Sequence, residues 1–118
     1  MAVVVKFKYD IEEIGSGTVD AGVISASYDE GGHMSNYEVA DAVTDQAIPI
    51  STTTGVTTIQ SLFIKSDQNI SIRQAAADTA LTVRANYPFM LMGAAITALL
   101  VSNASGSTAN IKIGVWGT

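Results

Sequence analysis

Alternation of apolar and polar residues, with a period of two, is the feature that most constrains the fold of this chain. It begins near the N-terminus, where every second residue is apolar: Val3, Val5, Phe7 and Tyr9. Successive side chains of a β-strand point to opposite faces, so this pattern predicts a half-buried strand. We expect the four residues to form one face of the core, and we expect removal of residues 1–9 to unfold the domain.

The same alternation continues to the C-terminus. It predicts further strands at residues 22–28, 56–65, 70–73, 81–84, 89–92, 96–102 and 109–116. Residues 67–69 make a connection short enough to pair the strands on either side of it as a hairpin. Turn residues recur at regular spacing and no long helix is indicated, so we predict an all-β fold, an antiparallel β-sandwich or jelly roll of about eight short strands.

The chain is predicted to be one β-sandwich domain over residues 1–118, because a chain of this length buries enough surface for one core but not for two. Its two parts differ in regularity. Residues 56–118 form the regular strand core, whereas residues 1–55 are a less regular, acidic N-terminal part with loops. Adjacent glycines mark residues 29–36 as a loop that adds little to the core. Residues 37–43 are compatible with a short helical turn, whereas residues 47–50 are extended around Pro49.

Charge is scarce and unevenly placed. Charged residues make up only 14% of the chain, against about 25% in an average soluble domain, which indicates a surface covered by sister subunits or a larger assembly. The net charge of −5, with six basic residues that do not cluster, argues against a nucleic-acid partner. Residues 1–45 hold nine of the acidic residues and only two lysines, an asymmetry that favours head-to-tail contact between copies.

Export and membrane insertion are not indicated. The N-terminus lacks the pattern of a secretory signal, and the absence of cysteine excludes disulfides and thiolate metal sites. The longest apolar stretch, residues 87–101, is interrupted by Pro88 and Gly93, whereas a membrane-spanning helix needs about 20 apolar residues. Two buried strands joined by a tight turn explain this stretch better.

No catalytic constellation is evident, so we predict that the protein is not an enzyme. The only histidine, His33, lies in the glycine-rich segment, and a solvated loop residue explains it better than a general base. The adjacent carboxylates of Glu12 and Glu13 point to opposite faces of a strand and do not converge on one substrate.

We predict no cofactor and no bound metal. One histidine without cysteine makes a zinc site improbable. Calcium remains an alternative, through loop oxygens of four residues without EF-hand spacing: Asp29, Glu30, Asn36 and Glu38. The glycines at residues 15–17 indicate a simple turn rather than a phosphate loop, and Asn103-Ala-Ser matches the glycosylation acceptor pattern.

Interface candidates lie in or beside the glycine-rich segment and near the C-terminus. They are Tyr28, His33, Met34, Tyr37 and Trp116. We expect Trp116 either to cap the core or to lie in a subunit contact. Residues 87–92 would also make an apolar interface anchor, although core packing explains them as well.

The strands after residue 58 resemble a known family. They read Ile59-Gln-Ser-Leu-Phe-Ile-Lys-Ser-Asp, Ile70-Ser-Ile-Arg, Phe89-Met-Leu-Met, Ile96-Thr-Ala-Leu-Leu-Val-Ser-Asn-Ala-Ser-Gly and Ala109-Asn-Ile-Lys-Ile-Gly-Val-Trp-Gly. This layout resembles the small jelly-roll virion proteins of tailed bacteriophages, in particular head decoration or cement proteins. The resemblance is a pattern of strands and turns, covers about half of the chain, and does not extend to residues 1–55.

The resemblance implies a non-enzymatic structural protein of the virion, assembled in the host cytoplasm. Such a subunit binds the outside of the assembled phage head and stabilises it, with the major capsid protein or another virion protein as its partner. It forms homo-oligomers, often trimers, and has neither nucleic acid nor a membrane as partner. The alternative is a carbohydrate- or receptor-binding module of a phage tail or fibre, with Tyr28, Asn36 and Tyr37 as a sugar platform.

Overall fold

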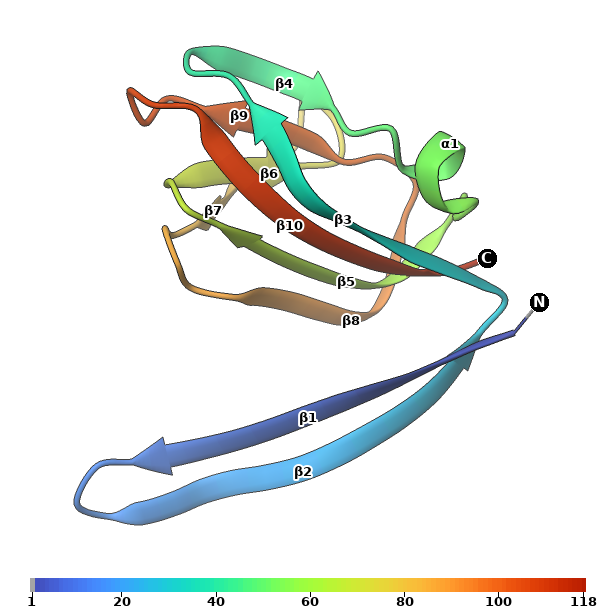
Figure 1. Cartoon of the computed structure of the whole chain (residues 1–118), viewed down its shortest axis with the longest axis vertical. Coiled ribbons are helices and arrows are strands. Elements are labelled where there is room, and N and C mark those ends of the chain that lie inside the picture. The colour runs from blue at the N-terminus through green and yellow to red at the C-terminus, as the bar shows by residue number, and fades with distance from the viewer. Residues whose placement is uncertain (1) are drawn as a thin grey trace.

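Two four-stranded antiparallel sheets face each other, and a two-stranded sheet projects beside them (Figure 1). The structure is a computed structural model that describes residues 2–118. Its elements, in chain order, are β1 (Val3–Glu13), β2 (Gly17–Tyr28), β3 (Glu30–Val39), β4 (Val43–Ala47), α1 (Ile50–Thr54), β5 (Ile59–Ser66), β6 (Ile70–Arg73), β7 (Leu81–Val83), β8 (Phe89–Ile96), β9 (Leu100–Asn103) and β10 (Ala109–Gly117). In the described residues, no helix is long and apolar enough to cross a membrane.

The topology of the two larger sheets is that of a jelly roll. The first sheet has the order β3-β10-β5-β8 and the second has the order β4-β9-β6-β7. The pairs β3–β10, β4–β9, β5–β8 and β6–β7 are those of one long hairpin wrapped onto itself into two layers. The prediction of an antiparallel sandwich of about eight strands is therefore confirmed.

The predicted hairpin across residues 67–69 is wrong. The strands on either side of it, β5 and β6, lie in different sheets, so this segment carries the chain from one layer to the other. The Asp67 carboxylate accepts hydrogen bonds from the backbone N–H and the side-chain amide of Asn110. These bonds tie the connection to β10 instead of closing a two-strand ladder.

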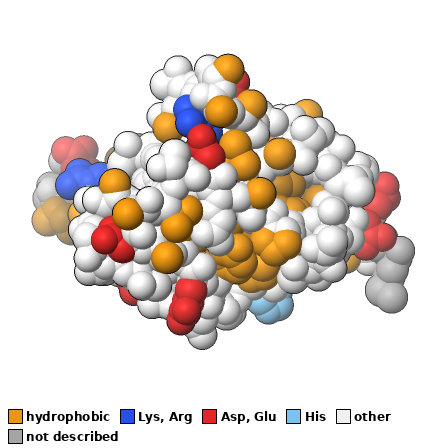
Figure 2. Space-filling model, turned by 90° about the horizontal axis from the view of Figure 1, so that it is seen from above, with side chains coloured by type: hydrophobic (Ala, Val, Ile, Leu, Met, Phe, Trp, Pro, Cys, Tyr) orange, Lys and Arg blue, Asp and Glu red, His pale blue; other side chains and the backbone are white. Residues whose placement is uncertain are grey.

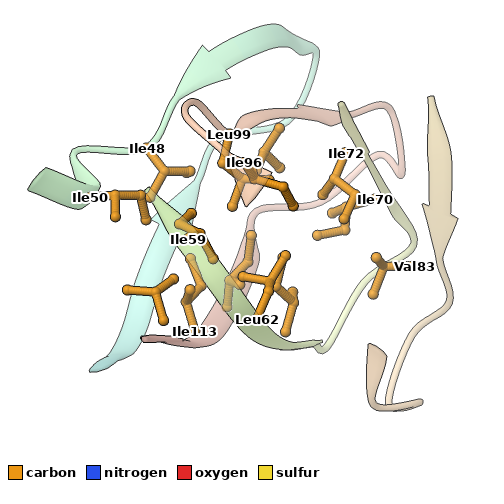
Figure 3. Close-up of a cluster of buried hydrophobic side chains, with 14 of the residues drawn as sticks. Ile48, Ile50, Ile59, Leu62, Ile70, Ile72, Val83, Ile96, Leu99 and Ile113 are labelled. Atoms are coloured by element: carbon orange, nitrogen blue, oxygen red, sulfur yellow. The ribbon is translucent and has the colours of Figure 1, made fainter. Parts of the chain in front are cut away.

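The hydrophobic core lies between the two larger sheets (Figure 3). Ile111, Ile113 and Val115 share the inward face of β10, as their alternation predicts, and each is 0% exposed. The buried cluster consists of Val39, Ile48, Ile50, Val56, Ile59, Leu62, Ile64, Ile70, Ile72, Val83, Ile96, Leu99, Val101, Ala109, Ile111, Ile113 and Val115. None of these residues precedes β3, so the core belongs to residues 39–115.

The expectation that the first strand forms part of the core is wrong. Val3, Val5, Phe7 and Tyr9 do lie on one face of β1, but none of them belongs to the core cluster. β1 pairs only with β2, in a register that runs from Val3 opposite Tyr28 to Glu13 opposite Gly17. Alternation shows that a strand has an apolar face, but it does not show what covers that face.

The predicted loop at residues 29–36 is also wrong, because Glu30–Val39 forms strand β3, paired with β10. The adjacent glycines permit close packing here rather than a turn. A Cβ at Gly31 would collide with the Trp116 ring, and a Cβ at Gly32 would come within 3.0 Å of Thr54 Cβ. His33 is therefore an exposed residue of a strand.

The helical turn that we expected at residues 37–43 does not form. Residues 37–39 are the end of β3 and Val43 begins β4, because these strands pair with β10 and β9. The helical turn is α1 and lies later in the chain, at Ile50–Thr54. Gly55 ends this helix in the left-handed conformation, with φ of +80°. The tight turn that we expected between two strands within residues 87–101 does not fall at Gly93, which lies within β8 with φ of +69°.

Candidate interaction surface

Strands β1 and β2 and the turn between them form a hairpin that we call the arm (residues 3–28). The turn is tight, because Ser16 N–H donates to Glu13 O over 3.0 Å and Gly15 and Gly17 have positive φ. This confirms the simple turn expected at residues 15–17. The arm runs beside the sandwich and ends in a tip that no other strand accompanies (Figure 1).

Two contacts anchor the arm to the sandwich. The Phe7 ring meets the Trp116 ring edge to face, with centroids 5.6 Å apart and planes at 88°. The Tyr28 hydroxyl shares a hydrogen bond with the hydroxyl of Ser61, which is buried. Ser61 and Trp116 lie opposite each other on β5 and β10, so both contacts fall on one part of the first sheet.

Beyond this anchor, the arm leaves apolar side chains in solvent. Phe7 is its only buried residue, at 8% exposed, whereas Ile11 is 54% exposed and Ile14 is 92% exposed. The exposed large apolar residues of the arm are Val4, Tyr9, Ile11, Ile14, Val19, Val23 and Ile24. An isolated two-stranded hairpin is only marginally stable in water, and apolar groups clustered on a surface mark a binding site.

Charge is graded along the arm. Its lysines, Lys6 and Lys8, lie toward the base, and its four acidic residues lie in the distal half: Asp10, Glu12, Glu13 and Asp20. The Tyr9 hydroxyl donates to the Asp20 carboxylate over 2.9 Å, and this bond, with the charge of Asp20, raises the pKa of Tyr9. Tyr9 lies over Gly22, where a Cβ would come within 2.8 Å of its hydroxyl. The tip of the arm is therefore acidic.

The outer face of the first sheet, which points away from the core, is the surface that holds the anchor. Next to Ser61 and Trp116 it carries an apolar strip of Phe63, Met90 and Met92, whose register pairs Phe63 with Met90 and Ser61 with Met92. Met90 and Met92 are exposed. The strip continues the anchor across β5 and β8.

Two lysines face each other at the far end of this outer face. Lys65 on β5 is directly opposite Lys112 on β10, and like charges at such a position destabilise a sheet. Both side chains are exposed, and within residues 2–118 neither forms a salt bridge. An acidic group from outside the sheet would relieve the repulsion between these two lysines.

The five interface candidates from the sequence do not share one face. Tyr28 belongs to the anchor, and His33 and Trp116 lie on the outer face of the first sheet, since they pair with Gly114 and Gly31. Met34 and Tyr37 instead pack against the core. Whether any of the five contacts a partner stays a prediction.

Sequence reasoning missed the exposed distal half of the arm. A signal was available, because residues 10–14 combine three acids with two isoleucines just before a glycine turn. Such a segment is too acidic for a core strand and too apolar for a plain loop.

A cleft of about 370 Å³ lies between the two sheets. Its lining is mainly apolar, and its charged lining residues are Arg73 and Asp78. The Arg73 guanidinium binds both oxygens of Asp45 and donates to the backbone oxygen of Asp78. The Arg73 hydrogen bonds hold the pKa of Asp45 below its usual value. The guanidinium therefore braces strands β4 and β6 rather than facing a ligand.

Metal-binding groups are dispersed. In the part of the chain that the structure describes, no group of three or more His, Asp or Glu side chains is placed to hold a metal ion. Three residues of the calcium alternative are spread along β3, with Glu30 at its start and Glu38 near its end, and Asp29 directly precedes this strand.

The sandwich surface carries few charges. Figure 2 shows hydrophobic side chains gathered near the middle of one face, with acidic and basic side chains scattered around them.

Comparison with protein-family models, with curated proteins and with solved structures found no match for the chain. Its class is therefore defined by its own topology, a jelly-roll β-sandwich with a projecting hairpin arm.

Proposed function

We propose that this protein is a non-enzymatic structural virion protein, a decoration or cement subunit that binds the outside of an assembled phage head and stabilises it. The observation that carries the proposal is the arm, an apolar-sided hairpin held to a jelly roll only at its base. The resemblance of the strands after residue 58 to small phage virion proteins supplies the setting. Jelly rolls commonly serve in viral capsids.

The mechanism is thermodynamic. A protein that binds the assembled shell, and not the free capsid subunits, stabilises the shell by mass action. Many copies on one shell act together, so weak individual contacts add up to strong retention. The net charge of −5 disfavours contact with nucleic acid and suits a position outside the shell.

The carbohydrate- or receptor-binding alternative has less support. A sugar platform needs exposed aromatic faces and free polar groups beside them. The Tyr28 hydroxyl is bonded to Ser61, and the Tyr37 hydroxyl accepts a hydrogen bond of 2.9 Å from the Gln46 amide. Tyr37 also packs against the core.

The test begins with phage particles produced by the organism that encodes this chain. Mass spectrometry of purified particles is expected to find the protein in a fixed, high ratio to the major capsid protein. Heads that lack the protein should release their DNA at a lower temperature, and added protein should restore the wild-type temperature. Absence of the protein from the particles would contradict the proposal.

Two variants test whether the arm is needed. Ile11→Asp changes an arm residue that is 54% exposed, and Leu81→Asp changes a residue of β7 that is 50% exposed. The two substitutions are matched in size, charge and exposure. We expect Leu81→Asp to restore head stability as the wild type does, and Ile11→Asp to restore little of it.

A further inference from the structure

We infer that the arm of one copy packs on the outer face of the first sheet of a second copy, with its acidic tip over Lys65 and Lys112. A second copy of the chain is thus the partner of the arm, which the virion proposal leaves open. The inference rests on the virion proposal only in treating the arm as an assembly element. Its test uses purified protein without phage particles, so the two can fail separately.

Most of the arm is uncovered within one chain. A two-stranded sheet needs a third layer or strand to be stable, and residues 8–21 of the arm are all exposed. Exposed apolar residues occur on both sides of the hairpin. Ile11 lies on the same face as Phe7, and Val4 and Val23 lie on the opposite face.

The outer face of the first sheet has an apolar surface that the arm of a second copy can cover. The apolar strip of Phe63, Met90 and Met92 is next to the anchor, and it ends at the lysine pair. Methionine and aromatic side chains are enriched at the centres of protein interfaces. The unbranched methionine side chain also adapts its shape to a partner.

The charges of the arm and of the outer face are complementary. From base to tip, the arm passes from apolar residues and lysines to four acids, and the outer face passes from an aromatic and methionine strip to two lysines. Glu38, opposite Asn110 at the β3 edge, bounds the basic pair on one side. Exposed ion pairs contribute about 0.2–1 kcal/mol each, so apolar burial supplies the affinity and the charges set the register.

The area available to docking is that of the arm beyond its anchor. Residues 8–13 of β1 are about 20 Å long at about 3.3 Å per residue, and a hairpin is about 10 Å wide. One docked arm therefore covers roughly 200 Å² on each partner, and reciprocal exchange of two arms buries roughly 800 Å² in total. This area is below the range of about 1,200–2,000 Å² for stable specific interfaces, so we expect a weak association that depends on protein concentration.

The experiment measures solution mass by light scattering over a range of concentrations. The wild-type protein is expected to have a mass that is a multiple of 12.3 kDa, falling toward one chain on dilution and in high salt. A monomer at every concentration up to about 1 mM, where even a weak contact of about −4 kcal/mol is half formed, would overturn the inference.

Variants assign the two surfaces. Ile11→Asp on the arm and the double variant Lys65→Glu, Lys112→Glu on the outer face are each expected to weaken association at least about tenfold. Leu81→Asp, on β7 of the other sheet, should leave the mass unchanged. Circular dichroism and melting curves check that all variants fold.

A charge exchange completes the test. An arm variant with Asp10→Lys, Glu12→Lys and Glu13→Lys should associate poorly alone, but it should associate with the Lys65→Glu, Lys112→Glu variant when the two are mixed. An oligomer mass that is restored in the mixture, and in neither variant measured separately, supports the pairing of these two surfaces. If the Lys65→Glu, Lys112→Glu variant stays fully associated while Ile11→Asp dissociates, the outer face is not the partner of the arm and the inference fails.

Discussion

The arm and the sandwich are built from the same alternating pattern, but they differ in what holds them. β10 buries Ile111, Ile113 and Val115 completely between two sheets. β1 has apolar residues at the same spacing, and only Phe7 among them is buried. The sandwich therefore covers its own apolar faces, whereas the arm leaves most of its apolar side chains exposed.

This difference shows that alternation reports the shape of a strand and not its environment. The sandwich strands are covered because the wrapped topology places a second sheet over each inward face. The arm precedes that topology in the chain and pairs only with itself. The apolar residues of β1 therefore lie outside the core cluster.

The same substitution in the two regions gives the largest contrast. Ile113→Ala removes a fully buried side chain and should lower the free energy of unfolding by about 4 kcal/mol. Ile11→Ala removes an exposed side chain and should change it by less than about 0.5 kcal/mol in dilute protein. Urea unfolding at low protein concentration measures both free energies of unfolding. Equal losses of stability in the two variants would show that the arm is part of the folding core.

A buried polar residue gives the next effect. Asn103 is 0% exposed, and its side-chain amide donates to the backbone oxygens of Val39, Ala40 and Ser107 while its oxygen accepts from Ser105 N–H. Asn103→Ala should cost about 3 kcal/mol, because it leaves buried carbonyl groups unpaired. Ser105→Ala, at an exposed hydroxyl, is the control, and a similar midpoint of unfolding in the two variants would contradict this role.

The anchor gives a smaller effect with its own reporter. Phe7→Ala removes the ring that meets Trp116, and such an aromatic pair contributes about 0.5–1.5 kcal/mol beyond area burial. Trp116 is the only tryptophan, so its fluorescence should shift to longer wavelength as the arm detaches. Tyr9→Ala, beyond the anchor, should leave the emission unchanged. A loss of sandwich stability comparable to that of Ile113→Ala would contradict the anchor role.

The smallest effect concerns pH. The pKa of Asp45 is lowered in the folded protein by its hydrogen bonds to Arg73. The ion pair therefore contributes its full stability above the usual aspartate value of 3.8, and that contribution is lost as the pH falls through the lowered folded value. Unfolding midpoints of the wild type and Asp45→Asn should converge on acidification, and a difference independent of pH would rule this out.

Much of the fold was predictable because its strands repeat one signal. Alternation located β2, β5, β6 and β10 and gave the correct inward face of β10. It does not give the partners of the strands, so the sequence predicts a hairpin at residues 67–69, where the chain passes from one sheet to the other. Pairing over long sequence separations leaves no local mark in the residues involved.

Glycine was the least informative residue. Gly15 and Gly17 do form a turn, but Gly31 gives space to the Trp116 ring more than 80 residues away in the chain. The residues next to a glycine in the sequence do not distinguish a turn from close packing against a distant side chain. The sequence therefore predicts a loop at His33, where the structure has strand β3. The fully buried Asn103 matches a glycosylation pattern in the sequence, yet its side chain is occupied by internal hydrogen bonds.

Hydrogen exchange, measured as a function of protein concentration, tests most directly whether the arm is an assembly element outside the stable fold. Amides of β5, β9 and β10 should be protected at every concentration. Amides of β1 and β2 beyond the anchor should exchange quickly in dilute protein and become protected as the concentration rises. Strong protection of the whole arm in protein shown to be monomeric would mean that the arm is a stable part of the fold by itself, and it would contradict the account.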